Sequence, residues 1–396
     1  MDFQYTPEQD AFRAEVRDWL AANLDPTLCV DDPKDERVAP DRETFEQRRL
    51  WQRTMYDSGW VGVAWPTEYG GRGAGLLEQV IFDEEYTNAH APVLPGYSGI
   101  ALCGPTLMHW GTDEQKERFL NRILNGDDVW CQGYSEPGAG SDLAGLQTKA
   151  VAEGDDFIIN GQKVWTSGAQ YADWIFMLVR TDPDAPKHRG ISYMLVNMKT
   201  PGVTVRPLVL MNGHAHFNEV FFEDVRVPKT NLVGPLNQGW KVAMTTLMFE
   251  RAYAGVGNYD DQIGRLAELS QQVSIDGEPA WEQSWVRQKL TQFHIESQAL
   301  KYTRLRGLTK LLKGLPPGPE GSMLKLCGSE LGIDIAAFAS ELLAGAAITE
   351  QATETVPDAP RWFNRVLSAR QYTIAGGTSE IQKNIMGERV LGLPKG

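Results

Sequence analysis

The chain has 396 residues, of which 38 are Lys or Arg and 52 are Asp or Glu, so its formal net charge is −14. A hydrophobic share of 42% suffices for a buried core and excludes general disorder. An acidic surface repels phosphate backbones, and the most basic stretch, residues 301–313, has the pattern of an amphipathic helix with a solvated face. The composition therefore argues against nucleic acid as a partner.

The cysteines and the N-terminal residues narrow the class further. The chain has four cysteines, Cys29, Cys103, Cys131 and Cys327. They lie far apart and form no C-x-x-C pair, so the sequence predicts neither a metal site nor a disulfide framework. Residues 1–16 carry acids where a signal peptide needs a basic start, and no run approaches ~18 apolar residues. We expect a cytoplasmic protein with reduced thiols, no targeting segment and no membrane partner.

The first third of the chain has helical patterning. Thr6 offers a side-chain cap, Pro7 is a favourable first helical residue, and apolar residues then recur at helical spacing. The same pattern predicts helices over residues 42–58, 77–88 and 115–124. We therefore assign residues 1–126 to an N-terminal helical domain.

The pattern changes at Asp127. Short segments rich in β-branched and aromatic residues predict strands within residues 149–153, 156–160, 174–180, 191–196 and 219–228. Helical periodicity returns after Gly234 and predicts helices over residues 240–253, 282–312, 322–343 and 363–388. The predicted fold class is α+β, with a central β domain at 127–232 and a C-terminal helical domain at 233–396.

The first chemical motif lies where the helical and β regions meet. Residues 133–145 (GYSEPGAGSDLAG) place small hydroxyl and acidic side chains among glycines. Glycines let backbone N–H groups approach a ligand closely, and the hydroxyls of Ser135 and Ser141 can donate to ring heteroatoms or phosphates. The alternative is a tight loop in which Glu136 and Asp142 only cap neighbouring groups. The G-x-S-x-G signature of serine hydrolases is absent from this segment.

The second motif follows shortly after. Residues 160–167 (NGQKVWTS) predict a turn and a strand that ends in the indole of Trp165 and two hydroxyls. A planar aromatic beside hydrogen-bond donors suits a tricyclic cofactor such as a flavin. Taken alone, Trp165 is better explained as a core residue, but the combination with the first motif favours a cofactor site.

Together with three later segments, these motifs resemble the acyl-CoA dehydrogenase family. The segments are Asn237–Lys241 (NQGWK), Phe249–Arg251 (FER) and Gly376–Gln382 (GGTSEIQ), in family order and at family spacing. The resemblance extends over essentially the whole chain. It implies FAD as cofactor, an acyl-CoA substrate, and a fold with an N-terminal helical domain, a central β-barrel or sandwich and a C-terminal four-helix bundle, usually assembled as a tetramer.

The resemblance also implies roles for individual residues. Ser135 stands where the family bonds the pyrimidine edge of the flavin, and Ser141 where it meets the cofactor phosphates or CoA. Trp165 stands where an indole shields the flavin, and Ser167 where a donor reaches flavin N5. The remaining cofactor positions carried over are Tyr134, Gly140, Thr166, Gly377, Thr378 and Glu380, of which Thr378 and Glu380 fall on positions that touch the adenosine half of FAD.

The implied reaction is α,β-desaturation of an acyl-CoA, in which a carboxylate removes the α-proton while the β-hydrogen leaves as hydride to flavin N5. The commonest family pattern supplies the base within a Tyr-Glu-Gly-Thr motif, but Gly376 occupies the glutamate position in this chain. A minority of the family carries the glutamate on the first long helix of the C-terminal domain, immediately before an arginine. Glu250 and Arg251 fit that placement, and an acid on so apolar a segment is a candidate for a raised pKa. The backbone N–H of Gly376 remains available as a donor to the thioester oxygen.

Two family motifs are altered. The Glu-Arg-x-x-Phe-Gly motif has no counterpart near residues 265–270, and the FAD-supporting Gln-x-x-Gly-Gly-x-Gly motif is reduced to ELLAGAA at 341–347. With residues 170–173 and 187–192, these losses resemble a branch that acts on steroid or other bulky acyl-CoAs, often as α2β2 complexes with fewer flavins than subunits.

Three functions follow from the sequence. The first is a catalytic acyl-CoA dehydrogenase that uses Glu250 and passes electrons to an electron-transfer flavoprotein, as a homotetramer or an α2β2 heterotetramer. The second is a non-autonomous partner subunit, favoured by the missing glycines of the adenine loop. The third is an oxidase of the same fold, an acyl-CoA or nitroalkane oxidase. Acyl length, branching and ring content cannot be read from these residues.

Overall fold

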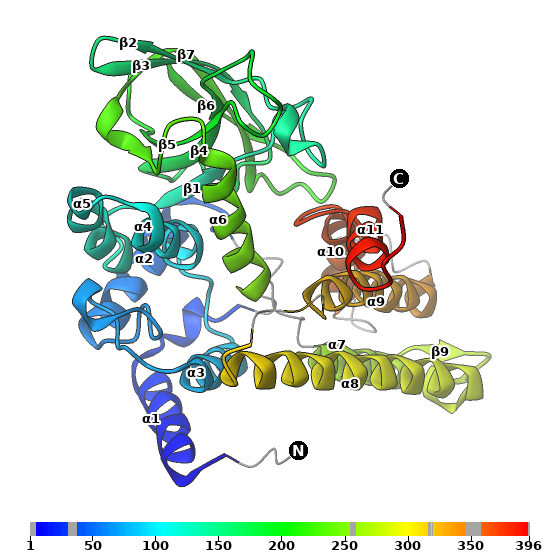
Figure 1. The fold of residues 1–396 in the computed structure, drawn as a ribbon. Helices are drawn as coiled ribbons and strands as arrows, with labels where there is room; N and C mark the ends of the chain where they lie inside the picture. The colour runs from blue at the N-terminus through cyan, green and yellow to red at the C-terminus, as the bar shows by residue number, and fades with distance from the viewer. Residues whose placement is uncertain are drawn as a thin grey trace. The chain divides into compact units, whose positions relative to one another are not determined.

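The computed structural model describes residues 5–30, 38–253, 259–315, 318, 320–344 and 358–394. The chain divides into two compact units, Met1–Glu250 and Arg251–Gly396, and each is described by itself. The first unit contains the N-terminal helices and the β-sheet, and the second is mainly helical (Figure 1). This order of α, β and α regions confirms the predicted fold class, whereas the domain boundaries at residues 126 and 232 stay a prediction.

Local capping signals determine where the N-terminal helices begin. Thr6 forms a capping box with Gln9 before α1, and Thr112 forms one with Gln115 before α5. The helices of this part are α1 (Pro7–Asn23), α2 (Arg42–Asp57), α3 (Leu76–Asn88), α4 (Gly104–Trp110) and α5 (Asp113–Leu124). The four predicted helices are confirmed, and α5 begins two residues before its predicted start. The structure adds α4, which continues a π-helical turn over Gly99–Cys103.

Indole rings fill the interior of this helical region. Trp19 stacks on Trp51 with ring centroids 5.4 Å apart, and Trp60 stacks on Phe82 at 5.9 Å. Trp51, Trp60 and Trp65 are all nearly inaccessible to solvent. Packing therefore accounts for these tryptophans.

The described strands of the first unit form one curved sheet of eight members. They are β1 (Trp130–Gly133), β2 (Lys149–Glu153), β3 (Asp156–Lys163), β4 (Trp174–Arg180), β5 (Ile191–Asn197), β6 (Val203–Leu208), β7 (Phe217–Pro228) and β8 (Leu232–Val233). The sheet order is β6-β7-β3-β2-β4-β5-β8, with β1 paired to β4. β1 and β2 run parallel to β4, and the other pairs are antiparallel. One core cluster contains inward-facing residues of six strands: β1, β2, β3, β4, β5 and β7. The sheet therefore encloses its own core (Figure 1).

β4 is buried on both faces. Ile175, Met177 and Val179 belong to the sheet core, whereas Trp174 lies against the helical region. The Phe119 ring of α5 meets Trp174 edge-on with centroids 5.0 Å apart. The first unit therefore has a continuous interior from α5 into the sheet.

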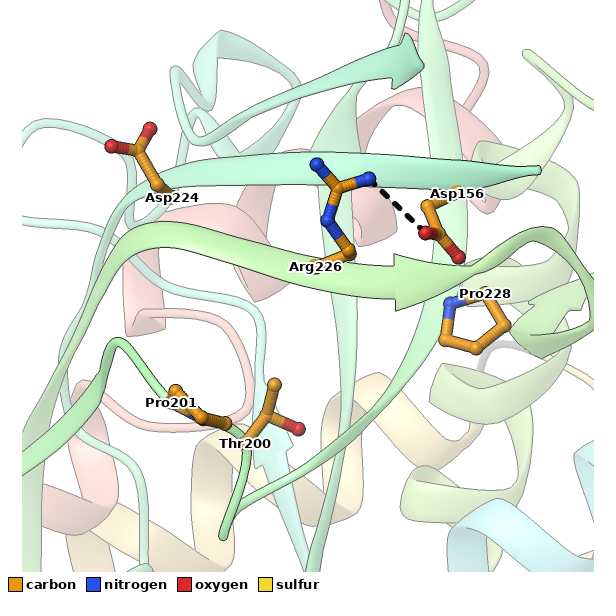
Figure 2. A pocket seen from close by; sticks show the side chains of 6 residues that line it. All are labelled: Asp156, Thr200, Pro201, Asp224, Arg226 and Pro228. Carbon is orange, nitrogen blue, oxygen red and sulfur yellow. Dashed lines mark hydrogen bonds and ion pairs between the residues drawn. The ribbon is translucent and has the colours of Figure 1, made fainter. Parts of the chain in front are cut away.

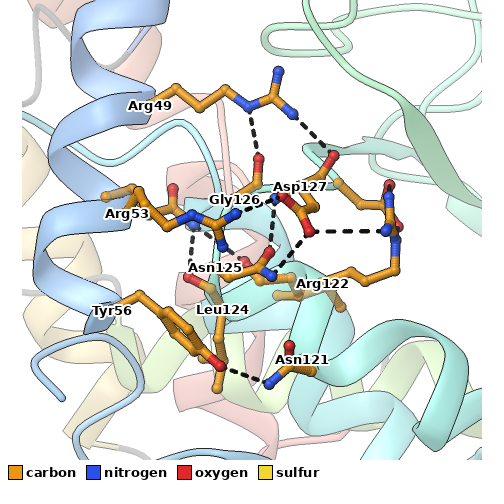
Figure 3. A network of polar contacts seen from close by, with 12 residues as sticks. Arg49, Arg53, Tyr56, Asn121, Arg122, Leu124, Asn125, Gly126 and Asp127 are labelled. Atoms are coloured by element: carbon orange, nitrogen blue, oxygen red, sulfur yellow. Dashed lines mark hydrogen bonds and ion pairs between the residues drawn. The ribbon is translucent and has the colours of Figure 1, made fainter. Parts of the chain in front are cut away.

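A polar network fixes the point where the helices pass into the sheet (Figure 3). From α2, Arg49 Nε donates to Gly126 O at 2.7 Å and Arg53 pairs with Asp127 at 3.2 Å. Arg122 of α5 makes two bonds to the Asp128 carboxylate, at 2.8 and 2.9 Å. Since β1 begins only two residues later, this network sets the direction in which β1 leaves the helices.

The second unit is built round one hydrophobic cluster. Its helices are α7 (Tyr259–Gln272), α8 (Ser284–Leu312), α9 (Glu320–Leu343), α10 (Ala359–Ser368) and α11 (Ser379–Arg389), with a short hairpin of β9 (Ser274–Ile275) and β10 (Glu278–Pro279). Side chains of α7, α8, α9 and α10, among them Leu266, Phe293, Phe338 and Trp362, share the core, as in a helical bundle.

One predicted helix is wrong. The expected continuous helix over 363–388 is divided into α10, a 3₁₀ segment over Ala369–Thr373, a turn and α11. Gly376 and Gly377 both have positive φ, +66° and +92°, and this left-handed backbone interrupts the helix between α10 and α11. In the described residues no helix is long and apolar enough to span a membrane.

Candidate functional site

The two predicted cofactor motifs meet directly in the structure. The backbone N–H of Val164, just after β3, donates to the carbonyl of Ser135, just after β1, at 2.9 Å. Glu136 and Ala139 exchange both of their backbone hydrogen bonds, so residues 136–139 form a tight loop. Seven predicted cofactor residues thus lie on two adjoining segments: Tyr134, Ser135, Gly140, Ser141, Trp165, Thr166 and Ser167.

Trp165 differs from the packed tryptophans. Its φ is +60°, a left-handed conformation that is strained for a bulky residue, and its side chain is 57% exposed. The only ring contact formed by the indole within the described residues is edge-on to Phe217, at a centroid distance of 5.8 Å. An exposed indole on strained backbone indicates a binding surface, because packing does not explain it.

The residues after Trp165 are tied to β7. Thr166 and Asn218 exchange backbone hydrogen bonds of 3.1 Å, and Asn218 Nδ2 also donates to Thr166 O. Thr166 itself is buried, and its hydroxyl has no hydrogen-bond partner among the described residues. Ser167 is half-buried beside it. Thr166, which directly follows the indole residue, is therefore held in place by β7.

The glycine-rich loop leaves open space. A Cβ added at Gly138 or Gly140 would meet nothing within 4 Å, and Ser141 is exposed. Ser135 is half-buried, while Tyr134 is buried with its ring edge-on to Phe176 at 6.1 Å. Open backbone, an unpartnered hydroxyl and an exposed indole on adjoining segments fit a large planar cofactor that carries phosphates.

A buried ion pair lies beneath these segments. Lys163 Nζ is 2.7 Å from Glu136 Oε1 and donates to Tyr134 O at 3.3 Å. Burial alone would raise the pKa of Glu136, but Lys163 and hydrogen bonds from Thr148 and Gln147 hold it below its ordinary value. Burial lowers the pKa of Lys163 to about 8, and the Glu136 carboxylate offsets only part of that shift. The sequence interpretation of Glu136 as a cap captured its bonds to the backbone of residues 147 and 148, at 2.6 and 2.9 Å, but missed Lys163.

A signal for this pair was present in the sequence. Phe157, Ile159 and Lys163 all fall on the inward face of β3, where two-residue alternation places every second side chain. A lysine on a core face needs an anion close by, because an isolated buried charge is very costly. Glu136 is the acid that the adjoining motif supplies.

α6 (Gly239–Tyr253), which carries Glu250 and Arg251, is anchored to the sheet at its first residue. A Cβ on Gly239 would lie 2.3 Å from the backbone carbon of Ser192 in β5, so only glycine permits this approach. Just before the helix, Asn237 has φ +64°, and its N–H donates to Ser192 Oγ at 2.9 Å. Thr181 Oγ1 lies 2.7 Å from the same Ser192 hydroxyl. The NQGWK motif therefore fixes the start of α6.

α6 is held a second time at its middle. Thr246 Oγ1 lies 2.9 Å from Thr106 Oγ1 of α4 in a fully buried contact, and Trp110 Nε1 donates to Thr245 Oγ1 at 2.9 Å. Figure 1 shows α6 running beside α4. Glu250 follows Thr246 by four positions along α6, about one helical turn. The side chains of Glu250 and Arg251 lie outside the described residues.

The remaining predicted residues belong to the second unit. Thr378 caps α11, since its hydroxyl accepts from Ile381 N at 3.2 Å, and Glu380 lies exposed in the first turn. A backbone hydrogen bond and the Thr378 hydroxyl hold the pKa of Glu380 below its ordinary value. Gly376 and Gly377 form a left-handed turn whose carbonyls accept from Gln382 Nε2. A β-carbon at position 376 would be strained, which accounts physically for glycine there. The altered FAD motif at 341–347 is described only as far as Ala344.

A separate cavity lies on the sheet (Figure 2). Its volume is about 470 Å³, and its lining residues are Asp156, Thr200, Pro201, Asp224, Arg226 and Pro228. Arg226 already pairs with Asp156 at 3.2 Å and with Glu153 at 2.6 Å, so its charge is compensated. No predicted site residue contributes to this cavity.

Comparison with known proteins places the motifs in one family. Models of the N-terminal, middle and C-terminal domains of acyl-CoA dehydrogenases match residues 6–127, 131–225 and 237–391. The chain is 39% identical to the acyl-CoA dehydrogenase IpdE1 of Mycobacterium tuberculosis over an alignment of 399 residues that covers 98% of each chain. It is 38% identical to IpdE1 of Mycolicibacterium smegmatis, again with 98% of each chain covered.

Solved structures are similar over the whole length. A chain of the ChsE4-ChsE5 complex from Mycobacterium tuberculosis is 34% identical, with a TM-score of 0.85 and 100% of each chain covered. A chain of the Tcur3481-Tcur3483 steroid ACAD is 32% identical, with a TM-score of 0.86 and the same coverage. The chain therefore belongs to the acyl-CoA dehydrogenase family and is an acyl-CoA dehydrogenase, an oxidoreductase that acts on a CH–CH bond.

Proposed function

We propose that this chain is a FAD-dependent dehydrogenase that introduces an α,β double bond into a bulky, steroid-derived acyl-CoA, with Glu250 as the base. The observation that carries the proposal is the junction of Ser135 with the strained, exposed Trp165 through the Val164 hydrogen bond. The likeness over the full chain length to a protein named as a steroid ACAD supports the substrate class. The alternative substrate is a CoA thioester of a small acyl group, and comparison of straight-chain, branched and steroid acyl-CoAs distinguishes the two.

The residues of the first unit suit the cofactor's flavin end. Trp165 offers an exposed ring, and Ser135, Thr166 and Ser167 on the two adjoining segments carry hydroxyl groups. Gly140 and Ser141 lie in the open part of the loop, where backbone and hydroxyl donors suit phosphate oxygens. We assign Tyr134 a supporting role beneath Ser135, and Gly377, Thr378 and Glu380 to the adenosine half. When bound, FAD supplies a two-electron acceptor for the β-hydrogen.

The base is assigned by position along α6. Asn237 and Gly239 fix the start of α6. The Thr106–Thr246 contact, about one turn before Glu250, fixes the orientation of α6 about its own axis. In the proposed mechanism the Glu250 carboxylate takes the α-proton, and the Gly376 N–H donates to the thioester oxygen as negative charge develops there. Residue 376 is a glycine without a side chain, which supports a base located elsewhere. Arg251 is assigned to the catalytic motif by its place beside Glu250.

Electron-transfer flavoprotein is the proposed acceptor, on the basis of the family resemblance. The unpaired thiols Cys29, Cys103, Cys131 and Cys327 support a cytoplasmic location. We propose a tetrameric assembly, either of one chain or of two.

The experiment begins with the chain purified alone. Its visible spectrum is recorded, and straight-chain, branched and steroid acyl-CoAs are added anaerobically. We expect bound flavin that is bleached fastest by the steroid thioester. Fastest bleaching by a short straight-chain thioester would overturn the substrate class, and a flavin-free chain that bleaches nothing would overturn the stand-alone catalyst.

A second experiment tests the base. Glu250→Gln is expected to retain FAD and ligand binding but to lose flavin reduction by about 10²–10⁴-fold, the usual effect of removing a positioned base. Glu268→Gln, which changes an exposed glutamate of α7, serves as the matched control and should reduce flavin normally. Reduction by Glu250→Gln at the wild-type rate would place the base elsewhere.

A second candidate function is a partner subunit that completes a heteromeric site. It is favoured by the likeness to a chain of the ChsE4-ChsE5 complex and by the shortened glycine motif at 341–347. Co-expression with the product of a neighbouring acyl-CoA dehydrogenase gene distinguishes the two. This candidate predicts that flavin binding and bleaching appear only in the co-purified complex.

A further inference from the structure

The Glu136–Lys163 pair joins every segment of the first unit that carries a proposed cofactor contact. Lys163 ends β3, and its ammonium bonds both to Glu136 and to the carbonyl of Tyr134. The other contacts of the carboxylate are with the N–H groups of Gln147 and Thr148, at the far end of the glycine-rich loop. One pair thus links the two ends of that loop to the residue that precedes Val164 and Trp165.

Burial makes this link stiff. Lys163 is fully buried and Glu136 nearly so, and charges in a low-dielectric interior interact strongly but tolerate little misplacement. The other cation that faces Lys163 is Arg180 of β4, whose charge contributes to lowering the pKa of Lys163. Arg180 Nη2 donates to Ala144 O at 2.7 Å, so it also holds the same loop. The groups around Lys163 all restrain residues 134–148.

Trp165 shows why such restraint is needed. Its left-handed backbone is unfavourable for an indole residue and persists only when its neighbours are fixed. On one side, Val164 N donates to Ser135 O at 2.9 Å, and on the other, Thr166 N donates to Asn218 O at 3.1 Å. The first of these bonds depends on the position of the Tyr134–Glu136 segment, which Lys163 holds.

We propose that Glu136 and Lys163 are positioning residues for the cofactor site, whose ion pair holds Ser135 in register with the strained Trp165. The proposal rests on the proposed function in so far as FAD is the ligand. Neither residue touches the cofactor in this scheme. They act through the segments that do.

The first test replaces Lys163 with methionine, which keeps the length of the side chain and removes its charge. In Lys163→Met we expect FAD affinity, titrated into the apoprotein, to fall at least tenfold, and the visible bands of the flavin to shift at saturating FAD. Lys199→Met is the matched control, because Lys199 pairs with Asp173 at 2.9 Å in the same unit but is largely exposed. It should keep wild-type affinity and spectrum. A normal flavin spectrum and affinity in Lys163→Met would overturn the proposal.

The second test separates positioning from folding. Lys163→Met leaves the Glu136 carboxylate buried without its cation, whereas Lys163→Met/Glu136→Gln removes both charges, an exchange that buried pairs often tolerate. We expect the double variant to melt near the wild-type temperature and still to bind FAD at least tenfold more weakly. Wild-type FAD affinity in a folded double variant would show that the ion pair has no positioning role.

Deuterium exchange of the apoprotein tests the link without any cofactor. Residues 134–148 and 161–168 should exchange faster in both variants, while α1 to α3 remain unchanged. Unchanged exchange in these two segments would overturn the link itself. If the wild-type chain binds no FAD, the proposed function fails, yet the exchange result still decides whether Lys163 holds the two segments together.

Discussion

The hydroxyls of Thr106 and Thr246 lie 2.9 Å apart where α4 crosses α6, and both residues are fully buried. Thr106 Oγ1 also bonds Leu102 O at 2.7 Å, so it keeps a partner when Thr246 is changed. The contact connects a helix of the N-terminal region to the helix that carries Glu250, one turn before that residue. Together with the bond from Trp110 to Thr245, it links α4 to the helix that carries the proposed base.

The first prediction follows from this contact. Thr246→Val keeps the shape of the side chain and removes the hydroxyl that contacts Thr106 and the Val242 carbonyl, so the free energy of unfolding should fall by about 1 kcal/mol. The rate of flavin reduction should fall more than FAD affinity, because the change acts on α6 rather than on the cofactor segments. Stopped-flow reduction and urea unfolding measure the two effects. Thr87→Val, at an exposed threonine whose hydroxyl bonds the Asp83 carbonyl of its own helix, should change neither. Equal loss of FAD affinity and rate would contradict this assignment.

The second prediction concerns Trp165. Glycine adopts positive φ freely, so Trp165→Gly should relieve backbone strain and raise the stability of the apoprotein by about 1 kcal/mol, while FAD affinity falls. A rise in apoprotein stability together with a fall in FAD affinity would indicate that the strained backbone at Trp165 serves cofactor binding. Thermal unfolding of the apoprotein and FAD titration give the two values. Asp276→Gly changes another residue with positive φ, in the β9–β10 turn, and should leave FAD binding unaltered. A destabilised Trp165→Gly apoprotein would show that the indole is a packing residue after all.

The sequence predicted those elements whose signals are local. The capping residues Thr6 and Thr112 and the turn residues between strands act within a few positions, so helix starts and the main strands were found. α4 was missed because Gly104 and Pro105 suggest an interruption, although proline is well placed in the first turn of a helix. The short strands β1, β6 and β8 were missed for lack of a long alternating run.

The sequence predicted the motif residues of the candidate site, but not the long-range contacts that hold those residues in place. Ser135 and Trp165 are predicted from their motifs and remain predictions as site residues, whereas the partnership of Glu136 with Lys163 spans 27 positions and depends on how β1 and β3 are placed. The strain at Trp165 could not be read from the sequence, because residue type alone does not reveal a positive φ. The contact that holds α6 likewise joins Thr246 to Thr106, which is 140 positions away. Long-range pairing, rather than residue type, is what the structure adds.

The third prediction is a pH dependence at Glu85. Burial would raise the pKa of this carboxyl, but hydrogen bonds and charges from Arg17 and Arg13, at 2.9 and 2.5 Å, hold it below its ordinary value of 4.5. A carboxyl with a lowered pKa in the folded state stabilises the fold above pH 4.5, and this contribution is lost as the pH falls through the folded-state value.

Glu85→Gln should therefore lower the free energy of unfolding by about 3 kcal/mol at pH 7, since it leaves Arg13 with only Glu84 as an anion. The difference from wild type should shrink as the pH is lowered below 4.5, as measured by urea unfolding at pH 7, 5 and 4. The neighbouring Glu84→Gln, which removes a more exposed partner of Arg13, should cost less than about 1 kcal/mol. A Glu85→Gln difference that grows towards low pH would contradict the sign of the shift.

The fourth prediction compares two glycines on either side of the start of α11. Gly376 has φ +66°, so Gly376→Ala should destabilise the second unit by about 1 kcal/mol or slightly more. Gly387 lies within the helix, where an added Cβ would meet only Leu393 Cδ1 at an ordinary 3.6 Å. Gly387→Ala should therefore stabilise α11 by about 0.5–1 kcal/mol.

The same strain bears on the base. Because a side chain at position 376 is disfavoured, Gly376→Glu in the Glu250→Gln background should not restore flavin reduction, even though it recreates the commoner family arrangement. Thermal unfolding of the two alanine variants gives the stability changes, and anaerobic reduction by the preferred acyl-CoA gives the rescue. Gly376→Ala and Gly387→Ala shifting stability in the same direction would argue against a left-handed turn at Gly376. Recovery of reduction by the double variant would show that this turn can present a carboxylate to the substrate despite its backbone strain.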